Sequence, residues 1–267
     1  MGTTLSSETA TVDLFWTSGW DSTFRLLQLL IVEKKVVQPH FVFFEKRISS
    51  AMELRCIEKI TEKIKERFPE AATRLLPIIQ CSSNDFPVDK ATLEAYRRII
   101  KTYFIGNQYV QLSDYCRLKG IKYLELSIHR DDKAHHLIEQ YSRKVEINGL
   151  VETRLDETIT PPDIARLFCD YLFPIFDLTK KEMESYSKEH QFDDIMDMTW
   201  FCHDPLPDGN PCGYCNPCVY TIREGMGHRI PYRDDTRYRI YRFAFRLLAP
   251  WRKVKRVLER LKKRIIG

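Results

Sequence analysis

Hydrophobic and polar residues change their spacing several times between residues 12 and 128, which predicts alternating strands and helices. Continuous apolar runs predict four strands, over residues 12–16, 36–44, 76–81 and 121–128. Apolar residues at three- and four-residue spacing predict helices over residues 23–33, 50–68 and 90–119. Pro39 is expected to interrupt the second strand, and Gly106 the third helix. Strands alternating with helices predict an α/β fold with a doubly wound parallel sheet.

The pattern weakens beyond the fourth strand, and shorter elements are expected there. Residues 145–154 predict a hairpin, Pro161 and Pro162 begin a helix, and residues 174–177 form a short extended piece. Ser50 with Glu53, and Thr179 with Glu182, have the spacing of capping boxes at helix starts. A last ordinary helix is expected to run through Met226. The expected regions are a flexible N-terminus (1–11), a nucleotide-binding α/β domain (12–190), a cysteine-bearing segment (191–228) and a basic helical tail (229–267).

Charge is distributed unevenly along the 267 residues. Residues 229–267 hold 14 Lys and Arg against 3 Asp and Glu, whereas residues 1–228 hold 28 against 34. Within the tail, apolar residues at helical spacing include Trp251 and lie between basic ones. Residues 244–267 therefore suit an anionic membrane surface, the phosphates of RNA, or packing on the body of the protein. These three alternatives stay open.

The rest of the composition excludes several classes of protein. A hydrophobic content of 43% is enough for a packed core. The sequence has neither an apolar run long enough to span a membrane nor an N-terminal secretion signal. Four of the eight cysteines crowd between residues 202 and 218, which indicates a metal site in a reducing cytoplasm rather than a disulfide scaffold. We therefore expect a cytoplasmic protein, with the tail as its one candidate for attachment to a membrane surface.

The turn after the first strand has the composition of a phosphate-binding loop. Residues 17–23 read Thr-Ser-Gly-Trp-Asp-Ser-Thr and lead directly into a helix, whose N-terminus carries partial positive charge and free amides. Neither the Walker loop nor the G-x-G-x-x-G fingerprint is present. Asp21 would repel a phosphate unless it binds Mg²⁺ beside it; the alternative is that Asp21 or Ser22 simply caps the helix.

The clustered cysteines have the spacing of a metal site. Cys202 is followed by Cys212, Cys215 and Cys218, and a loop rich in proline and glycine brings the first back to the other three. Four thiolates suit a tetrahedral structural zinc ion. An iron–sulfur cluster is the alternative, because Cys-x2-Cys-x2-Cys also occurs in such proteins.

Together, the two motifs resemble a known family. Residues 17–23 are similar to the S-G-G-x-D-S-[ST] loop of the PP-loop ATP pyrophosphatases, whose fold is called adenine nucleotide alpha hydrolase-like. Thr199-Trp200-Phe201-Cys202, followed by Pro211-Cys212-Gly213-Tyr214-Cys215-Asn216-Pro217-Cys218 and Arg223, resembles the C-terminal motif of 7-cyano-7-deazaguanine synthases. Gly106-Asn107 and Leu178-Thr179-Lys180-Lys181-Glu182 are similar to further segments of that family. The resemblance covers roughly residues 12–228.

The resemblance implies an ATP-dependent ligase with Mg²⁺ and a structural Zn²⁺ as cofactors. Such an enzyme adenylates a carboxylate, releases pyrophosphate, and lets ammonia displace AMP to give an amide, which a second activation converts to a nitrile. Asp21 and Lys180 would be the catalytic residues, acting on Mg²⁺–pyrophosphate and on the phosphates. The implied ATP-binding residues are Thr17, Ser18, Gly19, Trp20, Ser22, Thr23 and Asn107. The implied zinc ligands are Cys202, Cys212, Cys215 and Cys218.

The chain departs from the family where the substrate is recognised. Ser18 replaces a glycine of the loop, and the segments after the second and fourth strands, around Phe44 and from His129 to Lys133, differ from the D-Y-G-Q-R-H and Y-P-D-C motifs. Phe44, His129 and Asp131 are the candidate substrate residues, because ligands of parallel sheets gather where strands end.

Three functions are consistent with these observations. The first is a ligase acting on a small carboxylate, similar to a deazapurine, with a separate nitrogen donor. The second is a PP-loop tRNA-modifying enzyme whose basic tail holds the RNA. The third is a zinc-containing binding module without catalysis. A homodimer is a further partner expectation.

Overall fold

The structure is a computed structural model that describes residues 11–231 except 46, 48, 148 and 207, together with 236 and 243. The chain divides into two compact units, Met1–Trp200 and Phe201–Gly267. The predictions for the flexible N-terminus and the basic tail lie largely outside the described residues.

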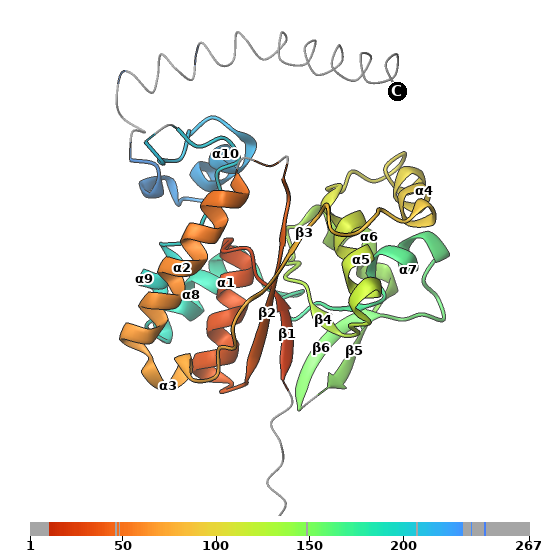
Figure 1. The fold of residues 1–267 in the computed structure, drawn as a ribbon, viewed down its shortest axis with the longest axis horizontal. Helices are drawn as coiled ribbons and strands as arrows, with labels where there is room; N and C mark the ends of the chain where they lie inside the picture. Colours follow the sequence, from red (N-terminus) through yellow and green to blue (C-terminus); the bar gives the residue numbers. More distant parts are fainter. Residues whose placement is uncertain are drawn as a thin grey trace, which may run out of the picture. The chain divides into compact units, whose positions relative to one another are not determined.

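A five-stranded parallel sheet forms the centre of the first unit (Figure 1). Its strand order is β3-β2-β1-β4-β7, so the chain builds outward from β1 first on one side and then on the other. This order confirms the doubly wound parallel sheet. The strands are β1 (Val12–Phe15), β2 (Val37–Phe43), β3 (Ile79–Ser82), β4 (Leu124–Glu125) and β7 (Tyr171–Leu172).

Helices cover both faces of this sheet, and each face has its own apolar core (Figure 1). One core includes Phe24, Phe41 and Phe192, and the other Tyr115, Phe168 and Tyr171. The first face carries α1 (Trp20–Leu27, continued by a π-helical turn Gln28–Val32), α2 (Ser49–Arg67), α3 (Pro69–Ala72), α8 (Lys180–Glu189) and α9 (Asp193–Met196). The second carries α4 (Lys90–Ile99), α5 (Gln108–Lys119), α6 (Lys133–Ile138) and α7 (Pro162–Phe168).

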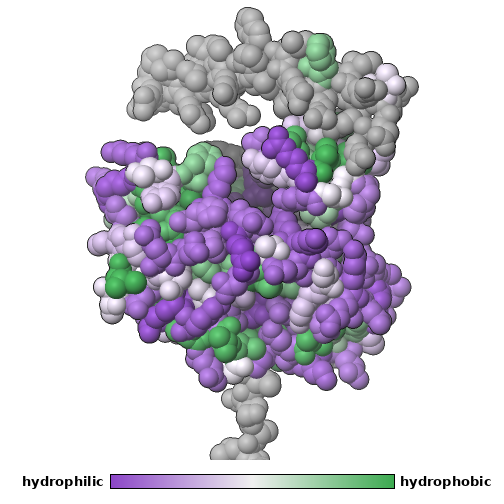
Figure 2. Space-filling view, turned by 180° about the vertical axis from the view of Figure 1, so that it is seen from behind, coloured by the Kyte–Doolittle hydropathy of each residue, from purple (hydrophilic) through white to green (hydrophobic). Residues whose placement is uncertain are grey.

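The remaining elements of the described chain are two 3-10 turns, a hairpin and one helix. A 3-10 turn, Glu139–Tyr141, follows α6 and leads into the antiparallel hairpin of β5 (Ser142–Ile147) and β6 (Leu150–Leu155). In the second unit, α10 (Asn216–Arg223) is followed by a 3-10 turn, Gly227–Arg229. Figure 2 shows a largely hydrophilic surface with small apolar patches. Among the described residues, no helix is long and apolar enough to cross a membrane.

Several local predictions were wrong. Pro39 does not interrupt β2, because it precedes the pairing of β2 with β3, which begins at His40 and Ile79, so the missing N–H removes no bond between these strands. The fifth strand lies at Tyr171–Leu172 rather than at 174–177. The α10 helix ends at Arg223 rather than Met226.

The two predicted capping boxes had different outcomes. Thr179 and Glu182 form theirs at the start of α8. Ser50 does not cap α2, because the helix already begins at Ser49 and the Ser50 hydroxyl donates to the carbonyl of Phe44. Glu53 instead accepts from Ser49 and Arg47.

A buried cluster of charges joins α1 to the sheet and the hairpin. The guanidinium of Arg25 donates to both carboxylate oxygens of Glu125 at 2.7 Å and to Glu152 Oε1 at 2.8 Å. Glu33 and Gln28 accept from its remaining nitrogen. Burial and the nearby Glu125 raise the pKa of Glu152 to about 8, in spite of the attraction of Arg25. Burial thus favours the protonated form of Glu152 in the folded chain.

Replacing the Glu152 carboxyl by an amide tests how its titration affects stability. The pKa of Glu152 is raised from 4.5 to about 8, so between these values the folded chain holds a proton that the unfolded chain has lost. The free energy of unfolding therefore falls as pH rises through this window, by at most about 1.4 kcal/mol per pH unit. Glu152→Gln should reduce this slope, measured by urea unfolding at pH 5–8. The control is Glu146→Gln, which changes an exposed carboxylate of the same hairpin; equal slopes in both variants would disprove the assignment.

Candidate functional site

The predicted phosphate loop joins β1 to α1 through a left-handed residue. Ser18, at the position where the resemblance expects glycine, has φ 56° and is fully buried. Its hydroxyl donates to the carbonyl of Glu53 at 3.0 Å, and its own carbonyl accepts from the Trp200 amide at 2.8 Å. Serine thus adopts the conformation that glycine favours, and two hydrogen bonds, one to α2 and one from Trp200, hold it in place.

Gly19 ends the loop and is the N-cap of α1, without a side-chain cap. A Cβ at this position would lie 3.3 Å from Thr17 Oγ1, so the close approach of the loop to itself favours glycine. Thr17 and Ser22 face one another, with their hydroxyl oxygens 3.5 Å apart. Neither Asp21 nor Ser22 is the N-cap of α1, so the alternative that one of them caps the helix is wrong.

A cavity of about 220 Å³ lies at the carboxyl ends of β1, β2 and β4, and we call it the switch-point cavity. It lies where the strand order reverses, which is the usual ligand position in doubly wound sheets. Its polar lining residues are Thr17, Asp21, Ser22, Arg47, Gln108, Tyr109, Ser127 and Asp132. The predicted residues Gly19 and Phe44 also line it.

Two carboxylates share this cavity. Asp21 Oδ1 is buried and has no hydrogen-bond partner among the described residues, and it lies 3.9 Å from His129 Nε2. Asp132 is the N-cap of α6 and accepts from the Ala134 amide at 2.7 Å. Burial raises the pKa of Asp132, and the charge of Asp21 raises it further. Two neighbouring carboxylates in a partly buried cavity favour a bound cation or a proton.

His129 and Lys180 lie at the same site. The Asp131 amide donates to His129 Nδ1 at 3.2 Å, so Nε2 carries the proton and faces Asp21. Lys180 is the first residue of α8, and its positive charge acts on Asp132, counteracting the rise in that carboxyl's pKa. Of the predicted residues, His129 thus lies beside Asp21, whereas Lys180 acts on Asp132 through its charge.

Other predicted residues have different positions. Asp131 is exposed, and its amide contributes to the site while its neighbour Asp132 lines the cavity. Asn107 is exposed at the N-cap of α5, and the next two residues, Gln108 and Tyr109, line the cavity instead. Thr23 is fully buried and accepts from the Trp16 indole N–H at 3.0 Å, so its hydroxyl holds the loop in place. Trp20 is half-buried and does not appear in the cavity lining.

Sequence reasoning missed Arg47, Gln108, Tyr109 and Asp132. Arg47 follows β2, donates to Ser49 Oγ at 2.8 Å and pairs with Glu53. Tyr109 is buried, and burial together with Asp132 and Asp21 raises its pKa. The sequence signal available for Asp132 was an aspartate directly before a helix, because aspartate is a preferred N-cap residue.

A larger hollow, of about 440 Å³, lies along α2 and β3. Apolar side chains form most of its lining, and its ionisable residues are Glu58, Glu62 and Lys65 from α2. None of the predicted nucleotide-binding or catalytic residues lines it, so it is a weaker candidate than the switch-point cavity.

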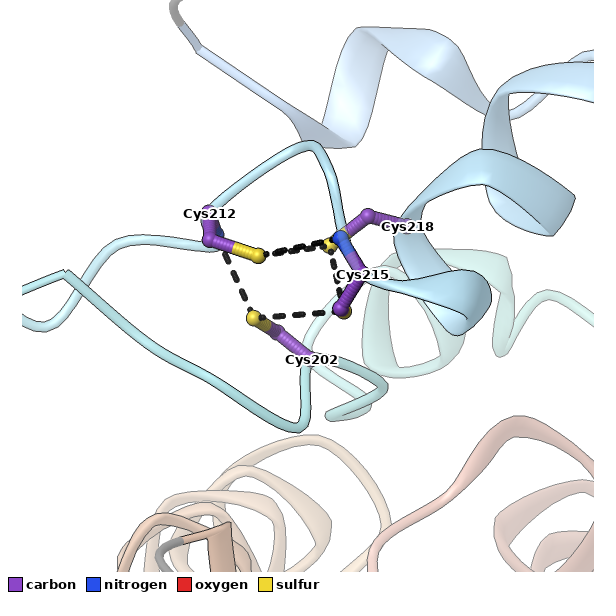
Figure 3. Close-up of side chains that lie close together, drawn as sticks. All are labelled: Cys202, Cys212, Cys215 and Cys218. Atoms are coloured by element: carbon purple, nitrogen blue, oxygen red, sulfur yellow. Dashed lines mark hydrogen bonds between the residues drawn. The ribbon is translucent and has the colours of Figure 1, made fainter. Parts of the chain in front are cut away.

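The four clustered cysteines lie in the second unit and point toward one another (Figure 3). Their sulfur atoms all lie within 4.8 Å of one another, and three measured separations are 3.4, 3.8 and 3.9 Å. Tetrahedral bonds of about 2.3 Å place thiolates about 3.8 Å apart, so the cluster fits one metal ion. The amides of Cys212 and Cys215 donate to the sulfurs of Cys202 and Cys212, respectively.

Comparison with known proteins finds similarity among solved structures, and one of these is described below. No protein-family model matches the sequence, and no curated protein does. The fold is similar to that of the U34-tRNA thiolase NcsA from Methanococcus maripaludis with its [4Fe-4S] cluster, at a TM-score of 0.39 and 14% sequence identity. The match covers 90% of this chain and 73% of that one.

The cysteine cluster is expected to stabilise its own segment. Cys218→Ser removes one of four thiolates from a fully buried position, so we expect loss of bound metal and a lower melting temperature. Metal per chain, measured on the purified protein by elemental analysis, checks this. The matched control is Cys169→Ser, a half-buried cysteine outside the cluster, and equal metal content in the two variants would contradict the assignment.

Proposed function

We propose that the chain binds ATP in the switch-point cavity and uses it to adenylate an acceptor, as PP-loop enzymes do. The observation that carries this proposal is Asp21, whose buried Oδ1 has no hydrogen-bond partner in the described chain although it lies in the first turn of a helix that follows a phosphate-type loop. A carboxylate at this position repels a phosphate bound by the loop. A cation bound between the carboxylate and the phosphate would offset that repulsion.

The donor atoms fit Mg²⁺. Asp21 and Asp132 offer carboxylate oxygens, the ligands that this hard cation prefers, at the edge of the cavity. The ion would neutralise the phosphates of the nucleotide and polarise the α-phosphate toward attack. The Thr17 and Ser22 hydroxyls and the first-turn amides of α1 would bind the β- and γ-phosphate oxygens. Lys180, whose charge acts on Asp132, would stabilise the charge that develops as pyrophosphate leaves.

For the acceptor, we propose the carboxylate of a small, deazapurine-like molecule. One carboxylate oxygen attacks the α-phosphorus, the bond to pyrophosphate breaks, and an acyl-adenylate forms. Ammonia then displaces AMP and gives an amide; a second adenylation, at the amide oxygen, expels that oxygen with AMP and leaves a nitrile. Phe44 offers an aromatic side chain in the cavity lining for a planar acceptor, and His129 Nε2–H is a hydrogen-bond donor beside Asp21.

A tRNA base is the second candidate acceptor, because adenylation by the same loop also serves PP-loop tRNA-modifying enzymes. The basic residues of the tail favour this alternative by their charge. Both candidates consume ATP and release AMP, so only the acceptor separates them.

We also propose that the four cysteines hold zinc as a structural ion. Separations near 3.8 Å suit four sulfurs on one ion, whereas the cysteines of a four-iron cluster each bind a different iron. A colourless protein with one zinc per chain is expected, and a brown protein with visible absorption would instead establish an iron–sulfur cluster.

Asp21→Asn tests the role in ATP use. The change keeps the shape of the side chain but removes the charge that holds Mg²⁺, so AMP formation should fall at least about 100-fold, or about 2.7 kcal/mol of transition-state stabilisation. Stability should not fall, because the lost carboxylate is unpartnered and lies beside Asp132. The control is Asp193→Asn, an exposed first-turn aspartate of α9. Full AMP production by Asp21→Asn would rule out the assignment.

The acceptor is identified by its product. We expect mass spectrometry, after incubation with ATP, Mg²⁺, ammonia and deazapurine carboxylates, to show a loss of mass that corresponds to amide or nitrile formation. 7-Carboxy-7-deazaguanine itself should react poorly, because the segments around Phe44 and His129 differ from the family's substrate motifs. Parallel reactions with tRNA and a sulfur donor are the comparison, and a modified nucleoside there, with no small-molecule product, would favour the second candidate.

A further inference from the structure

The last turn of α6 and the 3-10 turn that follows it carry three metal-ligating side chains on one face. His135, His136 and Glu139 each offer one ligand atom, and these atoms all lie within 4.8 Å of one another. Glu139 comes four residues after His135 and three after His136, so it lies one helical turn beyond both. This cluster lies in the first unit and contains no sulfur, which separates it from the four cysteines.

His135 is held in place with one ring nitrogen unsatisfied. Its side chain is 6% exposed, and its ring stacks on Phe176 with centroids 4.1 Å apart. Nδ1 is buried, has no hydrogen-bond partner within the described part of the chain, and lies 3.8 Å from Glu139 Oε2. A buried polar atom without a partner destabilises the folded state, and an ion bound between this nitrogen and the carboxylate would satisfy it.

His136 and Glu139 form the open side of the cluster. Both are exposed, and the His136 ring lies 5.6 Å from that of His135, at 84° to it. Side-chain rotation of these two exposed residues is enough to bring their ligand atoms toward a common ion, while stacking fixes His135. Nearby charges also include Asp177, which pairs with Lys144, and Arg130.

We propose that His135, His136 and Glu139 bind a divalent transition-metal ion, with water completing its coordination. Two imidazoles and one carboxylate select Zn²⁺, Co²⁺ or Ni²⁺ over Mg²⁺, which prefers oxygen ligands only. The ion fastens the last turn of α6, the helix whose N-cap, Asp132, lines the switch-point cavity. The assignment is independent of the proposed adenylation and of the cysteine site.

Cobalt binding to the full-length protein tests the site. The cysteine cluster is first saturated with zinc and excess metal is removed; Co²⁺ is then titrated and followed by visible absorption. We expect one further Co²⁺ per chain, with the weak bands of nitrogen and oxygen ligands and without sulfur-to-cobalt charge transfer. His136→Ala and Glu139→Gln should each weaken binding at least about tenfold, because each removes one of three protein ligands. Both residues are exposed, so the variants should fold.

The control is His190→Ala, a histidine at the end of α8 outside the cluster, which should bind Co²⁺ like the wild type. Co²⁺ should also raise the melting temperature of the wild type and of this control, but not of His136→Ala. Absence of a further cobalt ion, a charge-transfer band from sulfur, or equal binding by His136→Ala and the wild type would each overturn the proposal.

Discussion

The buried ion pair between Arg25 and Glu125 holds the two walls of the candidate site together. Arg25 lies four residues after Asp21 on α1, and Glu125 lies on β4, from which the chain continues directly to Asp132. Their side chains are 3% and 1% exposed and meet through two hydrogen bonds of 2.7 Å. Burying such charges is costly, and bidentate geometry offsets that cost only when both partners are held rigidly. The position of the phosphate loop relative to the end of β4 therefore depends on this pair.

The carboxylates around Arg25 and those of the switch-point cavity differ in how their negative charge is balanced. Around Arg25, one guanidinium faces Glu125, Glu152 and Glu33, and the excess of negative charge raises the pKa of Glu152 and so favours its protonated form. Within the described part of the chain, no guanidinium forms an ion pair with Asp21 or Asp132, and the positive charge of Lys180 acts on Asp132. An unpaired buried oxygen and a left-handed serine in one loop both cost folding free energy, which is typical of a site organised for a ligand.

The features of the site that the sequence predicted each lie within a short stretch of chain. The loop at residues 17–23 and the cysteine cluster were identified because a strand, a turn and a helix, or four thiolates, follow one another closely. The alternation of strands and helices predicts the class of fold, a doubly wound parallel sheet, but not the order of the strands in it. Arg47 follows β2, Asp132 follows β4, and Tyr109 lies on α5, which packs against the sheet. These three segments meet only in the folded chain, and no spacing in the sequence indicates that they do. Asp131 was chosen over Asp132 because a loop pattern does not reveal which of two adjacent aspartates turns inward.

Metal-ligating side chains of different chemistry gather in three parts of the described chain. Four of the eight cysteines lie in residues 202–218, carboxylates line the switch-point cavity beside His129, and two imidazoles with a carboxylate lie on α6 and its following turn. Thiolates bind zinc far more readily than Mg²⁺, so a cysteine in the cavity would draw zinc into a site suited to a nucleotide and its hard cation. The cavity lining contains no cysteine. On the proposed assignments, zinc would stay on the four sulfurs while Mg²⁺ would exchange with the nucleotide, because each ion would have the ligands that it prefers.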